Sequence, residues 1–251
     1  MTSSGALLAQ EGSRLVQDAA GRGFPLRLTG GVAIWIRSSG QTREALGRAY
    51  PDLDLVAHRK HSYLLPALLE GLGYQSERRF NAVHGDRRLI YHAADGSYHL
   101  DIFLDGFEMS HKLDLGRRLE VEDLTLPAAE LLLTKLQVAE LNRKDISDTV
   151  MLLSDHELAD KDGAGRLSVG PVVELCAADW CLFTTATDNL AKTRELLPEL
   201  LADDGWRSLV ASRVDELQRR LETVPKTMSW KLRARVGRRV RWYETPEEVA
   251  R

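Results

Sequence analysis

The first half of the chain spaces its apolar residues for both helices and strands. Helical spacing predicts a helix over residues 6–20, ended by Gly21 and Gly23. Residues 52–57 instead alternate acidic and apolar side chains, which is the period of a β-strand. The same criteria predict strands over 25–29 and 98–104, helices over 32–36, 41–49 and 63–72, and a hairpin of 78–84 with 87–92 around Gly85-Asp86. This order indicates an α/β (α+β) fold with a mixed β-sheet and flanking helices.

The second half of the chain has helical spacing alone. The predicted helices cover 128–141, continued or restarted over 145–153, and then 172–182, 188–201 and 206–221. A polar loop that contains two glycines, residues 160–165, separates the first of these helices from the rest. We therefore expect an α/β core over residues 1–125 and a helical domain over residues 126–251, with the C-terminal helices in residues 166–251.

Composition adds little to this picture but limits the setting. The formal net charge of −3 over 251 residues gives no global attraction to nucleic acid, so any basic surface must be local. No stretch of about 18 uninterrupted apolar residues suggests a membrane span. The N-terminus lacks the features of a signal peptide, and Cys176 and Cys181 are best read as free thiols in a reducing compartment. We expect a cytoplasmic protein.

The residues most suggestive of chemistry are a glycine pair and three aspartates in a fixed order. Asp52 and Asp54 are two apart on a predicted strand, so both side chains face the same way, and Asp101 on a further strand could join them. Close carboxylates repel one another unless cations lie between them, and carboxylates are the ligands that Mg²⁺ prefers. Gly30 and Gly31, at a strand–helix turn, would let backbone N–H groups approach a phosphate. Singly, each feature is more often a plain turn or a solvated strand edge.

Together these segments resemble the signature of the DNA polymerase β-like nucleotidyltransferase superfamily. The resemblance rests on Leu28-Thr29-Gly30-Gly31, Asp52-Leu53-Asp54-Leu55 and Leu100-Asp101-Ile102, and on the helical stretches 124–137 and 142–148. Within the superfamily, the chain looks closest to bacterial uncharacterised and AbiEii-like (abortive-infection toxin type) nucleotidyltransferases. The resemblance covers roughly residues 25 to 155.

The resemblance implies a role for each matching residue. Gly30 and Gly31 would hold the triphosphate of an NTP. Asp52 and Asp54 would bind Mg²⁺ or Mn²⁺, and Asp101 would complete the metal site or act as general base. Residues 126–155 would complete the active site, with Lys135 on the nucleotide phosphates and Asp145 orienting that lysine or another site residue.

Two spacings bear on this assignment. The interval from Gly31 to Asp52 is longer than usual in the superfamily, and the predicted helix over 41–49 would fill it. Lys135 and Asp145 fall on one stripe of a continuous helix, but ten residues would separate them by about 15 Å along its axis. A direct contact between them therefore requires a break or bend near Asn142.

Basic residues suggest where phosphate or RNA could bind. One of Arg78, Arg79, Arg87 and Arg88 could hold the triphosphate or an RNA acceptor, although a solvated basic hairpin is the commoner explanation. The C-terminal basic run mixes Trp230, Trp242 and Tyr243 with residues Arg219, Arg220, Lys226, Lys231, Arg233, Arg235, Arg238, Arg239 and Arg241. Such a mixture suits a nucleic-acid backbone and stacked bases, or a helix whose aromatic residues pack inward.

The predicted function is metal-dependent transfer of a nucleoside monophosphate from an NTP to an acceptor hydroxyl. The tRNA 3′ end is the acceptor that the toxin relatives imply, with an antitoxin as a further partner. The alternatives are a small-molecule, antibiotic-type nucleotidyltransferase, a non-catalytic nucleotide-binding domain of the same fold, and an unrelated α/β protein with coincidental acids.

Overall fold

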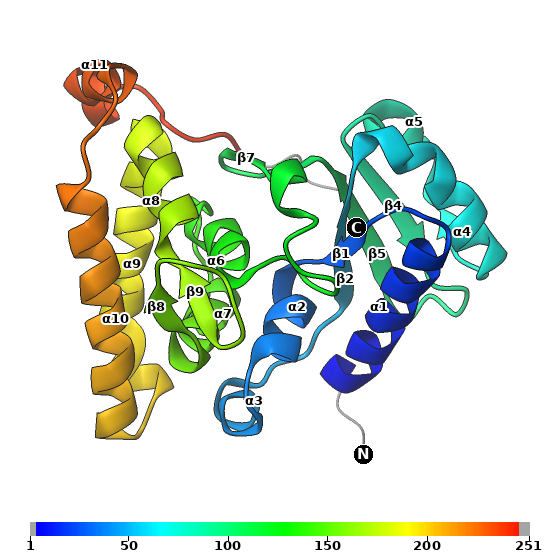
Figure 1. Ribbon diagram of the computed structural model, residues 1–251, viewed down its shortest axis with the longest axis horizontal. Coiled ribbons are helices and arrows are strands. Elements are labelled where there is room, and N and C mark those ends of the chain that lie inside the picture. Colours follow the sequence, from blue (N-terminus) through cyan, green and yellow to red (C-terminus); the bar gives the residue numbers. More distant parts are fainter. Residues whose placement is uncertain (1–3, 246–251) are drawn as a thin grey trace. The chain divides into compact units, whose positions relative to one another are not determined.

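The computed structural model describes residues 4–245, which form two compact units (Figure 1). Unit 1 contains the chain up to Arg37, together with Arg48–Phe107 and Asp114–Pro127. Unit 2 contains Ser38–Gly47, Glu108–Leu113 and the chain from Ala128 onward. The two units are described separately below.

Unit 1 is built on a five-stranded mixed sheet, which confirms the predicted fold class. Its strand order is β1 (Leu26–Leu28), β2 (Asp52–Ala57), β5 (His99–Leu104), β4 (Arg88–His92) and β3 (Gln75–Ser76). The central pair, β2 and β5, is parallel, and the three other pairs are antiparallel. Two strands distant in sequence therefore run side by side in register at the middle of the sheet.

The two faces of this sheet differ in chemistry because side chains alternate along each strand. On one face, Leu53, Leu55, Leu100 and Ile102 are fully buried. Helix α1 (Ser4–Gly21) packs closely on this face: a β-carbon at Gly12 would lie 2.6 Å from the Leu28 side chain and 3.2 Å from that of Leu53. The opposite face carries the aspartates of β2 and β5, so burial of the first face fixes the direction of the acidic side chains.

One predicted element of unit 1 is wrong. Residues 78–84 do not form a strand of a hairpin but helix α5 (Arg78–His84), which precedes β4. The Asn81 side chain of this helix hydrogen-bonds the backbone of β4 as a paired strand would. Its amide donates to the Ile90 carbonyl at 3.0 Å and accepts from the Ile90 N–H at 2.8 Å. β4 pairs instead with β3 and β5.

The remaining elements of unit 1 are short. Helix α2 (Gly30–Arg37) follows β1 after Thr29, and helix α4 (Leu65–Gly71) precedes β3. Two 3₁₀ turns, Arg59–Leu64 and Gly116–Arg118, lie in the connections. The helices at 6–20, 32–36 and 63–72 were therefore all predicted in the right places, with shifted ends.

Unit 2 is mainly helical, as the periodicity predicts. Its helices are α3 (Gly40–Leu46), α6 (Ala128–Leu136), α7 (Arg143–Asp155), α8 (Val169–Ala178), α9 (Trp180–Leu200), α10 (Asp204–Thr223) and α11 (Met228–Val236), followed by a 3₁₀ turn, Gly237–Arg239. Two strands that the pattern did not predict, β8 (Glu157–Ala159) and β9 (Arg166–Ser168), pair across the polar loop. Another small pair, β6 (Gly106–Glu108) and β7 (Lys112–Asp114), lies where the chain passes between the units.

No helix between residues 4 and 245 combines the length and the apolar character needed to cross a lipid bilayer.

Candidate active site

The aspartates predicted to bind metal lie on the polar face of the sheet of unit 1. Asp54 of β2 is the direct partner of Asp101 on the parallel strand β5, and Asp52 is the partner of His99. Direct partners in a sheet point to the same face, so all three carboxylates share that face. Asp52 and Asp54 are half-buried, whereas Asp101 is only 5% exposed. The structure thus brings the three predicted residues onto one surface.

Asp52 and Asp101 contact basic side chains of the same sheet. Asp52 Oδ1 lies 3.2 Å from Nδ1 of His99. Asp101 accepts two hydrogen bonds from the Arg88 guanidinium, one from Nε at 2.6 Å and one from Nη2. Arg88, one of the four arginines predicted around the hairpin, thus contacts Asp101.

The glycine turn lies directly beside Asp54. Gly30 has φ +64°, a conformation that side chains rarely adopt, and a β-carbon there would lie 1.9 Å from Asp54 Oδ2. The backbone holds the two segments together, since the Thr29 N–H donates to the Asp54 carbonyl at 2.9 Å. The long interval between the glycines and Asp52 is filled by α2 and α3, in agreement with the extra helix predicted there.

Gly31 has a weaker requirement for glycine. A β-carbon at this position would meet the end of the Arg48 side chain at 2.2 Å, and a flexible arginine can move away. Gly30 is therefore the residue of the pair that the local geometry demands. The role of both glycines in triphosphate binding stays a prediction.

The donor set suits a metal in part. Asp52 and Asp54 offer hard oxygen ligands beside the Gly30 turn, and Mg²⁺ is commonly held by one or two carboxylates together with substrate phosphates. A site of three protein ligands is not formed, because no three His, Cys, Asp or Glu side chains among residues 4–245 are arranged to hold a metal ion. The residues present thus fit a metal that enters with a nucleotide.

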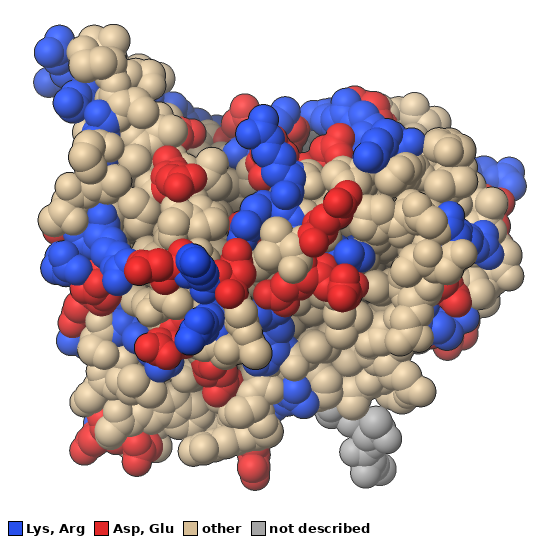
Figure 2. All heavy atoms as spheres, viewed as in Figure 1, with Lys and Arg blue, Asp and Glu red and all other residues tan. Residues whose placement is uncertain are grey.

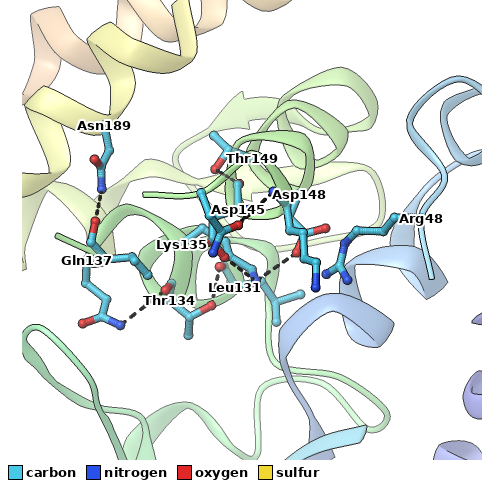
Figure 3. Close-up of polar contacts among 12 residues, drawn as sticks. Arg48, Leu131, Thr134, Lys135, Gln137, Asp145, Asp148, Thr149 and Asn189 are labelled. Atoms are coloured by element: carbon cyan, nitrogen blue, oxygen red, sulfur yellow. Dashed lines mark hydrogen bonds and ion pairs between the residues drawn. The ribbon is translucent and has the colours of Figure 1, made fainter. Parts of the chain in front are cut away.

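A second cluster forms in unit 2 around Lys135. Its ammonium Nζ lies 3.2 Å from Asp145 Oδ1 and 2.9 Å from Asp148 Oδ2 (Figure 3). The side chains are 12%, 12% and 0% exposed respectively, so water screens this cluster little. Lys135 is therefore an internal ion-pair partner, which excludes the simple alternative of a surface lysine.

The break in the helix that this contact requires is present. α6 ends at Leu136, and α7 begins after Asn142, whose side chain caps it by accepting from the N–H groups of Lys144 and Asp145 at 2.9 and 3.1 Å. The chain turns between the two helices, so residues ten apart in sequence come within ion-pair distance. The helix predicted over 128–141 thus ends earlier, at Leu136, and the break that the contact requires is present before Arg143.

Sequence reasoning assigned no role to Asp148. It lies three residues after Asp145 on α7, and residues at this spacing share a helix face. The spacing of the two acids was a usable signal, but the choice between them required the position of Lys135. With both carboxylates on one ammonium, the lysine is held from two sides.

The aromatic residues of the C-terminal basic run pack within unit 2. The Trp230 ring meets Phe183 with centroids 5.3 Å apart, and the Trp242 ring meets Trp180 at 6.5 Å. Arg233 lies over the Trp180 ring at 4.7 Å. The inward-packing alternative therefore describes these tryptophans.

Exposed basic side chains remain on α11 and on the 3₁₀ turn that follows it. Lys231, Arg235 and Arg239 are exposed, and basic atoms gather over this helix at the upper left of Figure 2.

Comparison with known proteins leaves the family open. No protein-family model matches the chain, and no curated protein matches it. A solved structure of the antibiotic-resistance factor ANT(2'')-Ia is 16% identical, covers 56% of this chain and 80% of its own, and has a TM-score of 0.39. An antigenic nucleotidyltransferase-like protein from Paracoccidioides brasiliensis is 16% identical, covers 88% of this chain and 95% of its own, and has a TM-score of 0.44. At TM-scores this low neither likeness carries an argument, so function is inferred from the residues of the site.

Proposed function

We propose that the protein is a nucleotidyltransferase that uses Mg²⁺ or Mn²⁺ to transfer a nucleoside monophosphate from an NTP to an acceptor hydroxyl. One observation carries this proposal: Asp54 faces Asp101 across a parallel strand pair, with Asp52 on the same face, and the Gly30 turn lies against Asp54. A carboxylate cluster beside a tight glycine turn suits a metal–triphosphate, because the turn admits phosphate close to the backbone while the acids hold the cation.

Each residue receives a role in the transfer. Asp52 and Asp54 would hold the metal, which neutralises phosphate charge and aligns the reacting oxygens. The acceptor hydroxyl would give its proton to Asp101. Its oxygen would bond to the α-phosphorus, while the bond between that phosphorus and the pyrophosphate oxygen breaks and pyrophosphate leaves.

Lys135 is assigned to the phosphates of the nucleotide. This role comes from the resemblance to nucleotidyltransferases, and the ion pairs with Asp145 and Asp148 supply the physical reason that the ammonium would stay fixed. Lysine recognises phosphate as a point charge, so a fixed position matters more than the orientation of its N–H groups. Asp145 and Asp148 are then positioning residues.

For the acceptor we propose RNA, with the tRNA 3′ end first. The exposed Lys231 and Arg235 of α11 and Arg239 of the following 3₁₀ turn favour a polyanionic acceptor over a cationic small molecule such as an aminoglycoside. Their neighbouring tryptophans pack inward, so contacts to the phosphate backbone are a better expectation than base stacking. An antitoxin partner is proposed only through the resemblance to AbiEii-like proteins.

A direct transfer assay tests the proposal. The protein is incubated with each labelled NTP, Mg²⁺ or Mn²⁺, and either total tRNA or a panel of aminoglycosides. Asp54→Asn is expected to abolish transfer, and Asp86→Asn, at an exposed aspartate of unit 1, to preserve it. Label on aminoglycosides and not on RNA would replace the proposed acceptor by the small-molecule alternative. Metal-dependent NTP binding without transfer to any acceptor would favour the non-catalytic nucleotide-binding domain.

A further inference from the structure

Arg88 is tied to Asp101 by the geometry of two neighbouring strands. Arg88 of β4 is the direct partner of Phe103 on β5, and Asp101 lies two residues before Phe103 on the same face. The guanidinium therefore reaches Asp101 diagonally across the strand pair, a distance that long side chains can span. It donates from Nε to Oδ1 and from Nη2 to Oδ2, so both carboxylate oxygens are engaged.

The Arg88 side chain is itself held in place. Its guanidinium carbon lies 5.2 Å from the centroid of the Phe103 ring and 5.5 Å from that of the Phe80 ring. Phe103 is a buried residue of β5, and Phe80 comes from α5. A planar guanidinium over aromatic rings is favourable, and it leaves the N–H fork pointing at the carboxylate. Helix α5 thus contributes to the polar face of the sheet by fixing an arginine.

This arrangement sets Asp101 apart from Asp52. A metal ligand gives a lone pair directly to the cation, whereas a carboxylate in a two-pronged arginine contact already has a cation against both oxygens. Asp101 and Arg88 are also the more enclosed pair, with side chains 7% and 24% exposed, whereas Asp52 and its partner His99 are 34% and 36% exposed. Asp52 contacts its imidazole partner through one oxygen, Oδ1.

We propose that Arg88 is a positioning residue that holds Asp101 as the proton acceptor and keeps it out of the metal's ligand set, so that Asp52 and Asp54 alone supply carboxylate ligands. This inference rests on the proposed nucleotidyl transfer. It replaces the three-aspartate metal site expected from sequence by two ligands and one arginine-held base. An ionised carboxylate has about four lone-pair directions, so Asp101 can accept the hydroxyl proton while it stays bonded to Arg88.

The ligand question is tested by Mn²⁺ binding in the presence of a non-hydrolysable NTP analogue, followed by electron paramagnetic resonance, because the site fits a metal that enters with a nucleotide. The double variant Arg88→Met with Asp101→Asn removes one positive and one negative charge together, so the net charge near the metal is unchanged. We expect its Mn²⁺ dissociation constant to stay within about threefold of the parent's, whereas Asp54→Asn weakens binding by at least about tenfold. Equal weakening in both variants would make Asp101 a metal ligand and overturn the inference.

The positioning role is tested separately by kinetics with Arg88→Lys, which keeps the charge but loses the fork. We expect kcat to fall by about 100-fold, with KM for the NTP nearly unchanged, because a misplaced group costs about that factor. A raised KM with unchanged kcat would instead make Arg88 a phosphate-binding residue and would contradict the proposal. Arg22→Met, at an exposed arginine of unit 1, is the matched control and should behave as the parent.

The two proposals fail in different ways. If the parent transfers label but the double variant loses Mn²⁺ as Asp54→Asn does, the inference fails and the enzyme remains. If the parent binds Mn²⁺ but transfers nothing, the ligand set is still decided by the binding data, while the transferase function fails. A parent that binds no Mn²⁺ overturns both. Thermal unfolding of each variant reports whether it folds. If the double variant does not fold, the kinetics of Arg88→Lys still test whether Arg88 positions Asp101.

Discussion

Gly30 and Asp54 are in contact in a way that no other residue at position 30 allows: a β-carbon there would lie 1.9 Å from the Asp54 carboxylate oxygen. The glycine turn and the acidic strand therefore form one local structure, although 23 residues separate the two in sequence. A change at the turn should act on the acid before it acts on the rest of the fold.

Gly30→Ala tests this coupling. The positive φ alone should cost about 1–2 kcal/mol of unfolding free energy, and the new methyl group must also displace Asp54. Gly73→Ala is the matched control, because Gly73 has φ +90° but no other atom within 4 Å of the added carbon. We expect urea unfolding to show a loss in both variants and Mn²⁺ binding to weaken only in Gly30→Ala. Equal Mn²⁺ binding in the two variants would contradict the coupling.

Lys135→Met should destabilise unit 2. Removal of the ammonium leaves Asp145 and Asp148 close together and buried without their shared cation, a change that typically costs about 3–5 kcal/mol. Lys144→Met, on the exposed part of α7, should change stability by less than about 0.5 kcal/mol. Both values can be measured by urea unfolding.

Adding Asp145→Asn and Asp148→Asn to Lys135→Met should recover part of the lost stability, because no buried charge is then left alone. A triple variant no more stable than Lys135→Met would show that shape, and not charge, sets the cost.

His111 should make unit 2 less stable in mild acid. Burial lowers its pKa below the ordinary 6.5. Thr185 fits an unprotonated ring nitrogen, since its hydroxyl oxygen lies 2.8 Å from His111 Nε2 and accepts from Trp242 Nε1 at 3.1 Å. The unfolded chain takes up a proton near pH 6.5 while the folded chain does not. The contribution of His111 to the free energy of unfolding should therefore be fully present above pH 6.5. It should fall as the pH drops toward the lowered folded-state pKa.

His111→Gln isolates this contribution. Glutamine cannot titrate, so the variant should lose less unfolding free energy than the parent between about pH 6.5 and 5. The comparison uses urea unfolding at each pH. Because His61 also has a pKa lowered by burial, His61→Gln serves as the reference for a second titrating group. Parallel pH curves for parent and His111→Gln would rule out the role of His111.

Neutralising the exposed basic residues of α11 and the 3₁₀ turn after it should weaken RNA binding. With Lys231, Arg235 and Arg239 all changed to Gln, tRNA binding should weaken and the slope of log affinity against log salt should fall by about 2–3. Each lost phosphate contact lowers that slope by nearly one. Changing the exposed Arg22 and Lys60 of unit 1 to Gln provides a control for the general loss of charge. An unchanged slope in this triple variant would exclude these three residues from the RNA-binding surface.

The sequence predicted the acids of the site better than their partners. The alternation in β2 puts Asp52 and Asp54 on one face whatever else the chain does, because that relation is local. The pairing of Asp54 with Asp101 depends on the register of two strands more than 40 residues apart, which alternation does not specify. The contact between Arg88 and Asp101 is harder still to predict, because the sequence pattern favours a strand where the structure has α5.

The end of α6 shows a second limit. Apolar spacing continues from Leu136 to Leu141, so periodicity extends the helix through both. In the structure, the Asn189 side chain donates to the carbonyls of Leu136 and Val138 at 2.9 and 2.7 Å. Asn189, more than 50 positions away in sequence, thus supplies hydrogen-bond donors to the carbonyl groups where the helix ends. Only the requirement that Lys135 meet Asp145 pointed to this break from sequence.

The division of the chain into its two units has a consequence for inheritance. In sequence, helix α3 lies between Arg37 and Arg48 of unit 1, but it belongs to unit 2. Its hydrogen bonds to Asp155 of α7 hold it there: the Thr42 hydroxyl donates at 3.0 Å and the Ser39 N–H at 2.8 Å. A gene shortened at Pro127 would keep every strand of the acidic sheet but leave α3 without this anchor. Recombination that moved unit 1 alone to another protein would also have to replace segment 38–47. We therefore expect the two units to be inherited together.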